Sequence, residues 1–301
     1  MRTRFAPSPT GPLHLGHAYS ALLAHDMARA AGGRFLLRIE DIDTTRSRPE
    51  WERQILDDLD WLGATPDEPP LRQSDRIGAY ERALDTLWRR ELIYPCTCTR
   101  RDIAAAASAP QEGAPPIGPD GLAYPGTCRD CLPAGYGAKP RPQGAALRLN
   151  MRRALALTGA VTFIETGESP EGLTGARTTS PDTFQAEIGD VVLSRRDFTG
   201  SYHLSVVLDD AAQRITLVPR GCDLFSATPI HVLLQCLLDL PTPTYHHHRL
   251  IRDEAGKRLA KRDDARAIAT YRADGATPGD IRAMVGLAAH PGLLRFPNIP
   301  G

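Results

Sequence analysis

Arg4-Phe-Ala-Pro-Ser-Pro-Thr-Gly-Pro-Leu-His-Leu-Gly-His17 is the stretch from which the organisation of this 301-residue chain can be worked out. Residues 3–6 predict a short strand, and the prolines and glycine that follow prevent it from continuing. From about Leu15 onward, small and apolar side chains recur at helical spacing. The sequence therefore predicts a strand, a tight turn and a helix within the first thirty residues.

The start of this helix carries two histidines, His14 and His17, which are three residues apart and share one face of the first turn. The first amides of a helix are unpaired and carry partial positive charge, so they suit an anionic phosphate. Imidazole donors beside them could follow charge that develops on phosphoryl oxygens. A capped helix start with two incidental histidines is the alternative. The strand, the turn and the histidine pair together favour the phosphate site.

A second short strand is expected over residues 35–39, and Glu40-Asp-Ile-Asp43 follows at its carboxyl end. Strand, helix and strand in this order are typical of a parallel nucleotide-binding sheet, whose ligands lie at the carboxyl ends of the strands. Acids there could bind a substrate ammonium or a metal. For Asp41 and Asp43, a helix cap or a solvated turn explains the sequence equally well. Arg4 in the first strand could face a carboxylate.

The remainder of the chain continues the α/β pattern. Amphipathic or apolar helices are expected over residues 49–62, 75–92 and 229–240, with a helix or two over 265–288. Further strands are expected over residues 145–150, 161–165, 190–194, 201–210 and 215–218. Among these, 201–210 is the strongest strand candidate, because it is an apolar run closed by two acids, Asp209 and Asp210.

Four of the six cysteines are bunched as Cys96-Thr-Cys98 and Cys128-Arg-Asp-Cys131. In a chain of this length, bunched thiols suggest a metal in a reducing cytosol rather than a disulfide framework. The segment between the pairs is rich in Ala, Gly and Pro, so a tetrahedral zinc would explain how it becomes ordered. Bare spacing favours four cysteine ligands, and a loop with free thiols is the alternative.

Composition excludes several classes of protein. The chain has 36 basic and 36 acidic residues, so no bulk charge attracts nucleic acid, and any nucleic-acid partner would have to meet a local basic patch. No apolar run approaches a membrane span, and the first residues lack the apolar stretch of a signal peptide. We therefore expect a cytoplasmic protein without a membrane partner, and a monomer.

His14-Leu-Gly-His17 resembles the HIGH signature of class I aminoacyl-tRNA synthetases, and the run that begins at Arg4 resembles the glutamyl/glutaminyl subgroup. The resemblance implies that the two histidines hold the phosphates of ATP. A second match begins at Ser201, where a Tyr-to-Asp-Asp segment is followed by Arg-Gly. The residues that the resemblance implies for glutamate are Arg4, Ser8, Glu40, Tyr202 and Arg220.

Residues 256–262 resemble the KMSKS loop of the same family, with departures. Arg258 stands where the first Lys is usual and Ala260 where Ser is usual, whereas Lys261 matches. A mobile cationic loop can close over a triphosphate and offset charge on the leaving pyrophosphate. The resemblance thus implies that Lys261 is catalytic, and the two departures put the rate of activation in doubt.

Cys-x-Cys followed by Tyr-x-x-x-Cys resembles the zinc site of glutamyl-queuosine tRNA(Asp) synthetases. This resemblance implies that Tyr124 is the fourth ligand beside Cys96, Cys98 and Cys128, and Cys131 competes with Tyr124 for that place. Glutamyl-tRNA synthetases carry an anticodon-binding domain after the KMSKS loop, and only 39 residues follow Arg262 here. The chain therefore resembles the catalytic half alone, as in the glutamyl-queuosine enzymes.

We expect a Rossmann-like parallel-sheet catalytic domain in two halves, 1–95 and 145–252. A small zinc-binding insertion, 96–144, would separate them, and the KMSKS-like loop with a short helical tail would occupy 253–301. The resemblance implies a ligase that activates glutamate with ATP and Mg²⁺ in the absence of tRNA. It would then transfer glutamate to the queuosine base of tRNA(Asp). Alternatives are a truncated glutamyl-tRNA synthetase that charges a tRNA 3′ end, a non-catalytic tRNA-binding paralogue, and a nucleotidyltransferase for another small acid.

Overall fold

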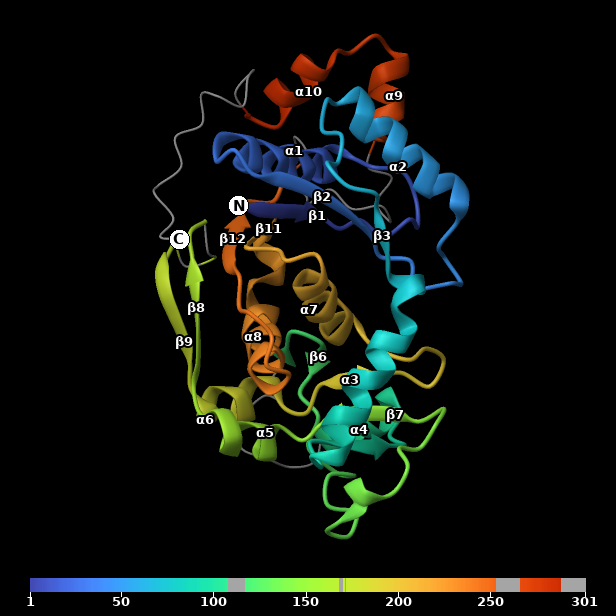
Figure 1. The fold of residues 1–301 in the computed structure, drawn as a ribbon, viewed down its shortest axis with the longest axis vertical. Helices are drawn as coiled ribbons and strands as arrows, with labels where there is room; N and C mark the ends of the chain where they lie inside the picture. The colour runs from blue at the N-terminus through green and yellow to red at the C-terminus, as the bar shows by residue number, and fades with distance from the viewer. Residues whose placement is uncertain (108–116, 168–169, 171, 253–265, 288–301) are drawn as a thin grey trace.

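The computed structural model describes residues 1–107, 117–167, 170, 172–252 and 266–287. A central layer of mostly parallel strands organises the fold (Figure 1). Its first part pairs β1, β2 and β3 in parallel: Arg2–Phe5, Arg34–Ile39 and Leu71–Arg72. Its second part has the order β11, β12, β8 and β9: Leu217–Gly221, Thr244–His248, Val161–Glu165 and Gly175–Thr179. Only β9 runs antiparallel to its neighbour in this second part.

The two parts of the layer meet where β1 lies beside β11. The Thr216 amide donates to the Arg2 carbonyl at 3.0 Å, and the Arg2 amide donates to the Thr216 hydroxyl at 2.9 Å. From β1 the chain builds β2 on one side and later β11 on the other, so the strand order reverses here. Ligands of open parallel sheets bind at such a reversal, outside the carboxyl ends of the strands.

Helices cover both faces of this layer, as Figure 1 shows. One face carries α1, α2, α9 and α10: Leu15–Ala30, Pro49–Trp61, Ile268–Ala273 and Pro278–Met284. The other face carries α3, α7 and α8: Ile77–Arg89, Tyr202–Ala212 and Thr228–Leu237. Each face has its own apolar core, with Leu22 and Phe35 in the first and Leu204 and Leu233 in the second. The predicted α/β fold with a parallel sheet is confirmed.

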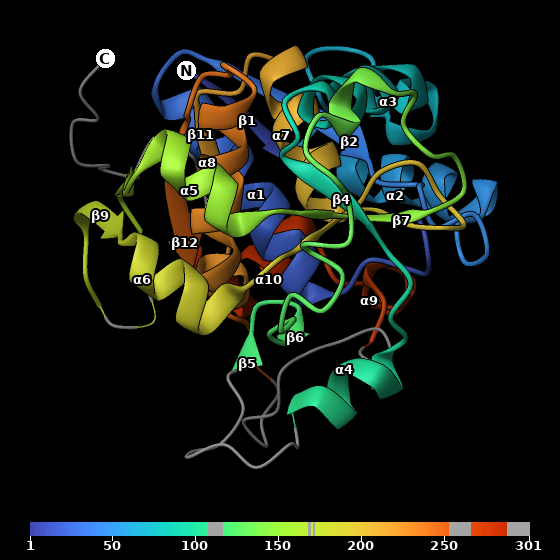
Figure 2. The ribbon, with the colours of Figure 1, turned by 90° about the horizontal axis from the view of Figure 1, so that it is seen from below.

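A smaller antiparallel sheet lies beside the second core. It consists of β4, β7 and β10: Ile93–Cys96, Ala146–Leu149 and Val192–Ser194. Between β4 and β7 the chain forms α4, β5 and β6: Arg100–Ala107, Ile117–Gly118 and Gly121–Leu122. Figure 2 shows α4 and the β5–β6 hairpin together at one edge of the molecule. Short helical segments complete the fold at Gln73–Arg76, Tyr136–Ala138, Met151–Thr158, Pro181–Thr183, Phe184–Ile188 and Cys222–Ala227.

The strand predicted for residues 201–210 is wrong, because this segment is helix α7. Ser201 caps the helix, and its hydroxyl accepts the Leu204 amide at 3.4 Å. Seven of the eleven residues of α7 are buried, including Asp209 and Asp210, and only Ala212 at its end is exposed. A helix enclosed on all sides has no polar face, so its sequence shows a continuous apolar run in place of a 3.6-residue period.

The tail segment predicted as helical contains α9 and α10. None of the helices in the described ranges combines the length and the apolar character that crossing a bilayer demands.

Candidate active site

A cavity of about 430 Å³ opens at the carboxyl ends of β1 and β11, where the strand order reverses. The described residues that the sequence predicts to bind glutamate or ATP all line it: Arg4, Ser8, His14, His17, Glu40, Tyr202 and Arg220. The structure therefore brings the histidines at the start of α1 and the residues expected to hold an amino acid into one space. Lys261, Arg258 and Ala260 lie outside the described residues.

Each of the two histidines at the start of α1 caps the helix through its own Nδ1 atom. His14 Nδ1 accepts the Gly16 amide at 3.1 Å, and His17 Nδ1 accepts the His14 amide at 3.2 Å. A neutral imidazole that accepts at Nδ1 carries its proton on Nε2. Both rings can therefore present an Nε2–H donor, and they stack with centroids 3.7 Å apart. Helix capping and phosphate binding are thus compatible, because they use opposite ring nitrogens.

Gly16 is required by the packing of the first of these rings. A Cβ at this position would lie 3.0 Å from the His14 Cε1 atom and 3.1 Å from Nδ1. Both distances are shorter than ordinary van der Waals contact, so a larger residue would displace the His14 ring. The glycine between the histidines therefore helps to fix the orientation of His14.

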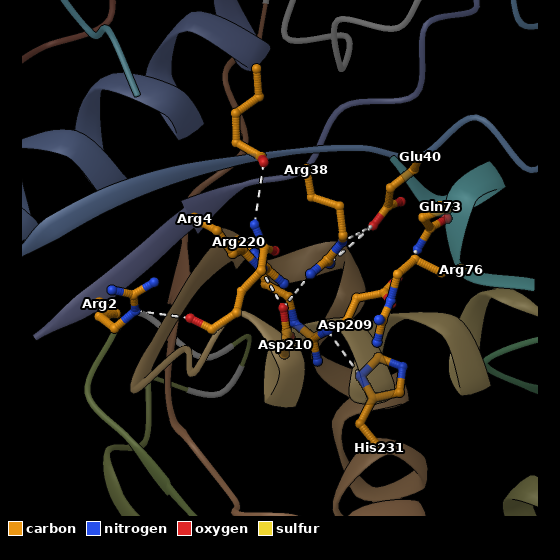
Figure 3. A network of polar contacts seen from close by, with 12 residues as sticks. Arg2, Arg4, Arg38, Glu40, Gln73, Arg76, Asp209, Asp210, Arg220 and His231 are labelled. Carbon is orange, nitrogen blue, oxygen red and sulfur yellow. Dashed lines mark hydrogen bonds and ion pairs between the residues drawn. The ribbon is translucent and has the colours of Figure 1, made fainter. Parts of the chain in front are cut away.

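A buried cluster of charges adjoins the cavity, and two of its members, Arg4 and Glu40, line it (Figure 3). Asp210 of α7 accepts from Arg4 Nε at 3.1 Å and from Arg38 Nη1. Arg38, which is fully buried, also donates from Nη2 to Glu40 Oε1 at 3.1 Å. Asp210 therefore compensates two arginines, and Arg38 fixes the orientation of the Glu40 carboxylate.

Burial and charge act in opposite directions on the acids of this cluster. Burial raises the pKa of Glu40, although Arg38 and Arg4 partly oppose the rise. Burial also favours the neutral form of Asp210, but Arg38 and Arg4 outweigh it and hold the pKa of this carboxyl below its ordinary value. A cation bound beside Glu40 would lower the Glu40 pKa and stabilise the carboxylate.

Arg220, at the end of β11, is held by three acceptors. Its Nε donates to His247 Nε2 at 3.1 Å, Nη1 to His231 Nδ1 at 3.0 Å, and Nη2 to the Thr228 hydroxyl at 2.7 Å. A guanidinium has five N–H donors, so two remain after these three bonds. The His247 ring is in turn held by Glu165, and both side chains are fully buried.

Tyr202 is the first residue of α7, and its ring lies 5.6 Å from the His231 ring in an edge-on arrangement. Burial raises the pKa of Tyr202, although nearby Arg220 opposes the rise, so the hydroxyl stays protonated near neutral pH. The charged residues that line the cavity are three arginines, Arg4, Arg220 and Arg249, against two acids, Glu40 and Asp223. This excess of one positive charge favours an anionic ligand.

The cysteine cluster is brought together by β4, β6 and the turn after Tyr124. The Sγ atoms of Cys96, Cys98 and Cys128 lie within 4.8 Å of one another. The Tyr124 hydroxyl lies 3.4 Å from the Cys96 and Cys98 sulfurs. Cys131 is exposed, and its thiol faces the Thr127 carbonyl at 3.8 Å. Three thiols and a phenol therefore surround one point, a donor set that suits tetrahedral zinc.

Comparison with known proteins places the chain in a family. Residues 1–117 and 179–291 match the family described as tRNA synthetases class I (E and Q), catalytic domain. The glutamyl-Q tRNA(Asp) synthetase of Rhodobacter capsulatus is 64% identical over 291 residues, which span 95% of this chain and 100% of that protein. This chain belongs to the glutamyl-Q tRNA(Asp) synthetase family. It is therefore a ligase of the class I synthetase type. The Nocardia farcinica member is 43% identical over 94% of this chain and 82% of its own length.

Solved structures agree with this placement. A glutamate tRNA ligase from Elizabethkingia meningosepticum, in complex with its amino acid, superposes with a TM-score of 0.72 and 28% identity. The match covers 95% of this chain and 60% of that ligase, so the chain spans about three fifths of the solved enzyme. A methionyl-tRNA synthetase from Mycobacterium tuberculosis shares the fold at 12% identity and a TM-score of 0.57.

The sequence reasoning missed three residues that organise the cavity. Arg38 was read only as part of a strand, although a charged residue within a buried β run signals an internal ion pair. Asp209 and Asp210 received no role. Asp209 joins α7 to α3 and to the segment before it. It accepts from Gln73 Nε2 at 3.0 Å, Arg76 Nε at 3.2 Å and Tyr80 Oη at 2.7 Å.

Proposed function

We propose that this ligase activates glutamate with ATP in the absence of tRNA and transfers it to the queuosine base of tRNA(Asp). The names of its relatives support the substrate and the acceptor. The observation that carries the first step is the shared cavity, in which an amino-acid subsite of positive excess adjoins the two histidines of α1.

Glutamate binds across β1, β2 and β11 in this proposal. Arg220 points its two remaining N–H donors at a carboxylate, because its other three are bonded to the protein. Glu40, oriented by Arg38, accepts from the substrate ammonium. Arg4 and Ser8, with Tyr202 from α7, complete the subsite.

ATP binds with its phosphates at the start of α1, where His14 and His17 donate through Nε2–H. An oxygen of the glutamate α-carboxylate forms a bond to the α-phosphorus as the bond to the pyrophosphate oxygen breaks. The nucleophile is already ionised, so the chain supplies positioning and charge stabilisation and needs no general base. Mg²⁺ bound to the triphosphate supplies further positive charge. Lys261, outside the described residues, is proposed to offset charge on the leaving group.

Cys96, Cys98, Tyr124 and Cys128 are proposed to hold a structural zinc. The geometry around them supports Tyr124 over Cys131, because only the former contacts the other sulfurs. Bound zinc would tie β4 to the segment around Cys128, whose local sequence offers few apolar side chains for a core.

Pyrophosphate exchange with glutamate, ATP and no tRNA tests the first step. The proposal expects exchange that depends on glutamate, and a folded, zinc-loaded protein without exchange would refute it. For the second step, labelled glutamate is incubated with a tRNA pool and its position is mapped. Label on the anticodon-loop base supports transfer to queuosine, whereas label on the 3′-terminal adenosine supports the truncated glutamyl-tRNA synthetase.

A further inference from the structure

The β5–β6 hairpin, which lies between the two cysteine pairs, contacts the network behind the glutamate subsite. Asp120, in the turn of this hairpin, accepts from His203 Nε2 at 3.0 Å and 3.1 Å through its two oxygens. His203 Nδ1 lies 3.1 Å from His231 Nε2. His231 Nδ1 is also hydrogen-bonded to Arg220. Four side chains, Asp120, His203, His231 and Arg220, therefore form a hydrogen-bonded series that runs from the hairpin to the cavity.

The direction of every hydrogen bond in this series follows from the residues at its two ends. Arg220 can only donate, so His231 accepts at Nδ1 and carries its proton on Nε2. That proton is donated to His203 Nδ1, so His203 carries its own proton on Nε2. A carboxylate can only accept, so Asp120 accepts the hydrogen bond that His203 donates from Nε2–H. Burial lowers the pKa of His231 well below its ordinary value, so this ring is neutral, as these hydrogen-bond directions require.

We propose that Asp120 is a positioning residue for glutamate binding, acting through His203 and His231 on Arg220. Its carboxylate holds His203 in the one tautomer that lets His231 accept from Arg220. Without that acceptor, His203 can move its proton to Nδ1, which would set two N–H groups against each other. His231 would then turn its Nδ1 away from Arg220. This inference rests on the proposed role of Arg220 in binding glutamate.

The hairpin is seated so that Asp120 reaches His203. Gly118 packs directly on the Phe184–Ile188 segment, because a Cβ at this position would lie 2.6 Å from the Glu187 carbonyl oxygen. Just after the hairpin, Tyr124 forms a β-bridge with Gly189, the residue that follows this segment. The same insertion that carries the cysteine cluster therefore places Asp120. Through this contact the insertion helps to set the affinity for glutamate, in addition to any structural role.

Steady-state pyrophosphate exchange on the full-length protein tests the proposal. Asp120→Ala should raise KM for glutamate about three- to tenfold, the effect of losing the buried hydrogen bond from Arg220 to His231, with kcat and KM for ATP unchanged. Asp120→Asn keeps an acceptor oxygen and should restore KM to within about twofold of wild type. The matched control is Asp130→Ala, an exposed insertion acid paired only with exposed Arg152 in the described structure. If Asp120→Ala behaves like this control, or if Asn at position 120 is as damaging as Ala, the proposal is wrong.

A second measurement does not depend on activity. Nitrogen-15 NMR of labelled histidine should show Nε2–H tautomers for His203 and His231 in the wild type, and a mixture for His203 in Asp120→Ala. An Nδ1–H tautomer of wild-type His231 would refute the chain of hydrogen bonds. Absent exchange with correct tautomers would instead count against the proposed function alone. The two failures are therefore distinguishable.

Discussion

Replacement of Asp210 by Asn should destabilise the protein more than any other single loss of charge in the cavity. The side chain is 7% exposed, and its carboxylate compensates two arginines, one of which is fully buried. Removing one partner of a buried ion pair costs about 3–5 kcal/mol, because the remaining charge stays buried without compensation. Asn keeps the shape of Asp but leaves Arg4 and Arg38 with Glu40 as the acid nearest to them. We therefore expect a loss of about 3–5 kcal/mol in the free energy of unfolding at pH 7.

Urea unfolding of wild type and Asp210→Asn, followed by circular dichroism, measures this difference. The folded pKa of Asp210 lies below the ordinary value, so its contribution is present above the pKa of the unfolded chain and disappears as pH falls through the folded value. The difference between the two proteins should therefore shrink below about pH 4. Asp130→Asn, which removes an exposed charge, should match wild type throughout. A loss below about 1 kcal/mol at pH 7, or one independent of pH, would refute the reasoning.

Three further predictions concern other parts of the molecule. His17→Asn keeps an acceptor on Cγ for the His14 amide but lacks Nε2–H, so exchange should slow about 10²- to 10³-fold while the melting temperature stays unchanged. Equal exchange rates would exclude His17 as a phosphate donor. Metal analysis should find zinc in Cys131→Ala and none in Cys128→Ala; loss of zinc in Cys131→Ala would make Cys131 the fourth ligand in place of Tyr124. Burial raises the pKa of Asp58 to about 6, and its oxygens have no partner in the described ranges. The pKa of Asp58 is higher in the folded protein than in the unfolded chain, so the free energy of unfolding falls as pH rises through about 6. Asp58→Asn should therefore gain up to about 3 kcal/mol in urea unfolding at pH 8 and little at pH 4; a pH-independent gain would contradict this.

The elements near the amino terminus could be predicted because their signals are local. Two prolines and a glycine end a strand whatever surrounds them, and α1 begins at Leu15, where the periodic apolar residues start. The paired histidines, Glu40 and the cysteines could be singled out for the same reason, and the structure gathers the first three in one cavity and three of the cysteines in one cluster. Their proposed roles remain predictions, since shared location in a cavity does not test a role.

Tertiary structure decided what local pattern could not express. Helix α7 was taken for a strand, because a helix enclosed by the sheet and its neighbours has no solvent face to give it a period. Asp210 owes its importance to Arg4 and Arg38, which are 206 and 172 residues away in the chain. The same applies to Asp120 and His203, 83 residues apart. The sequence by itself predicted which side chains would carry the chemistry, because those signals are local, whereas the packing of distant segments determined which charges are paired and which side chains line one cavity.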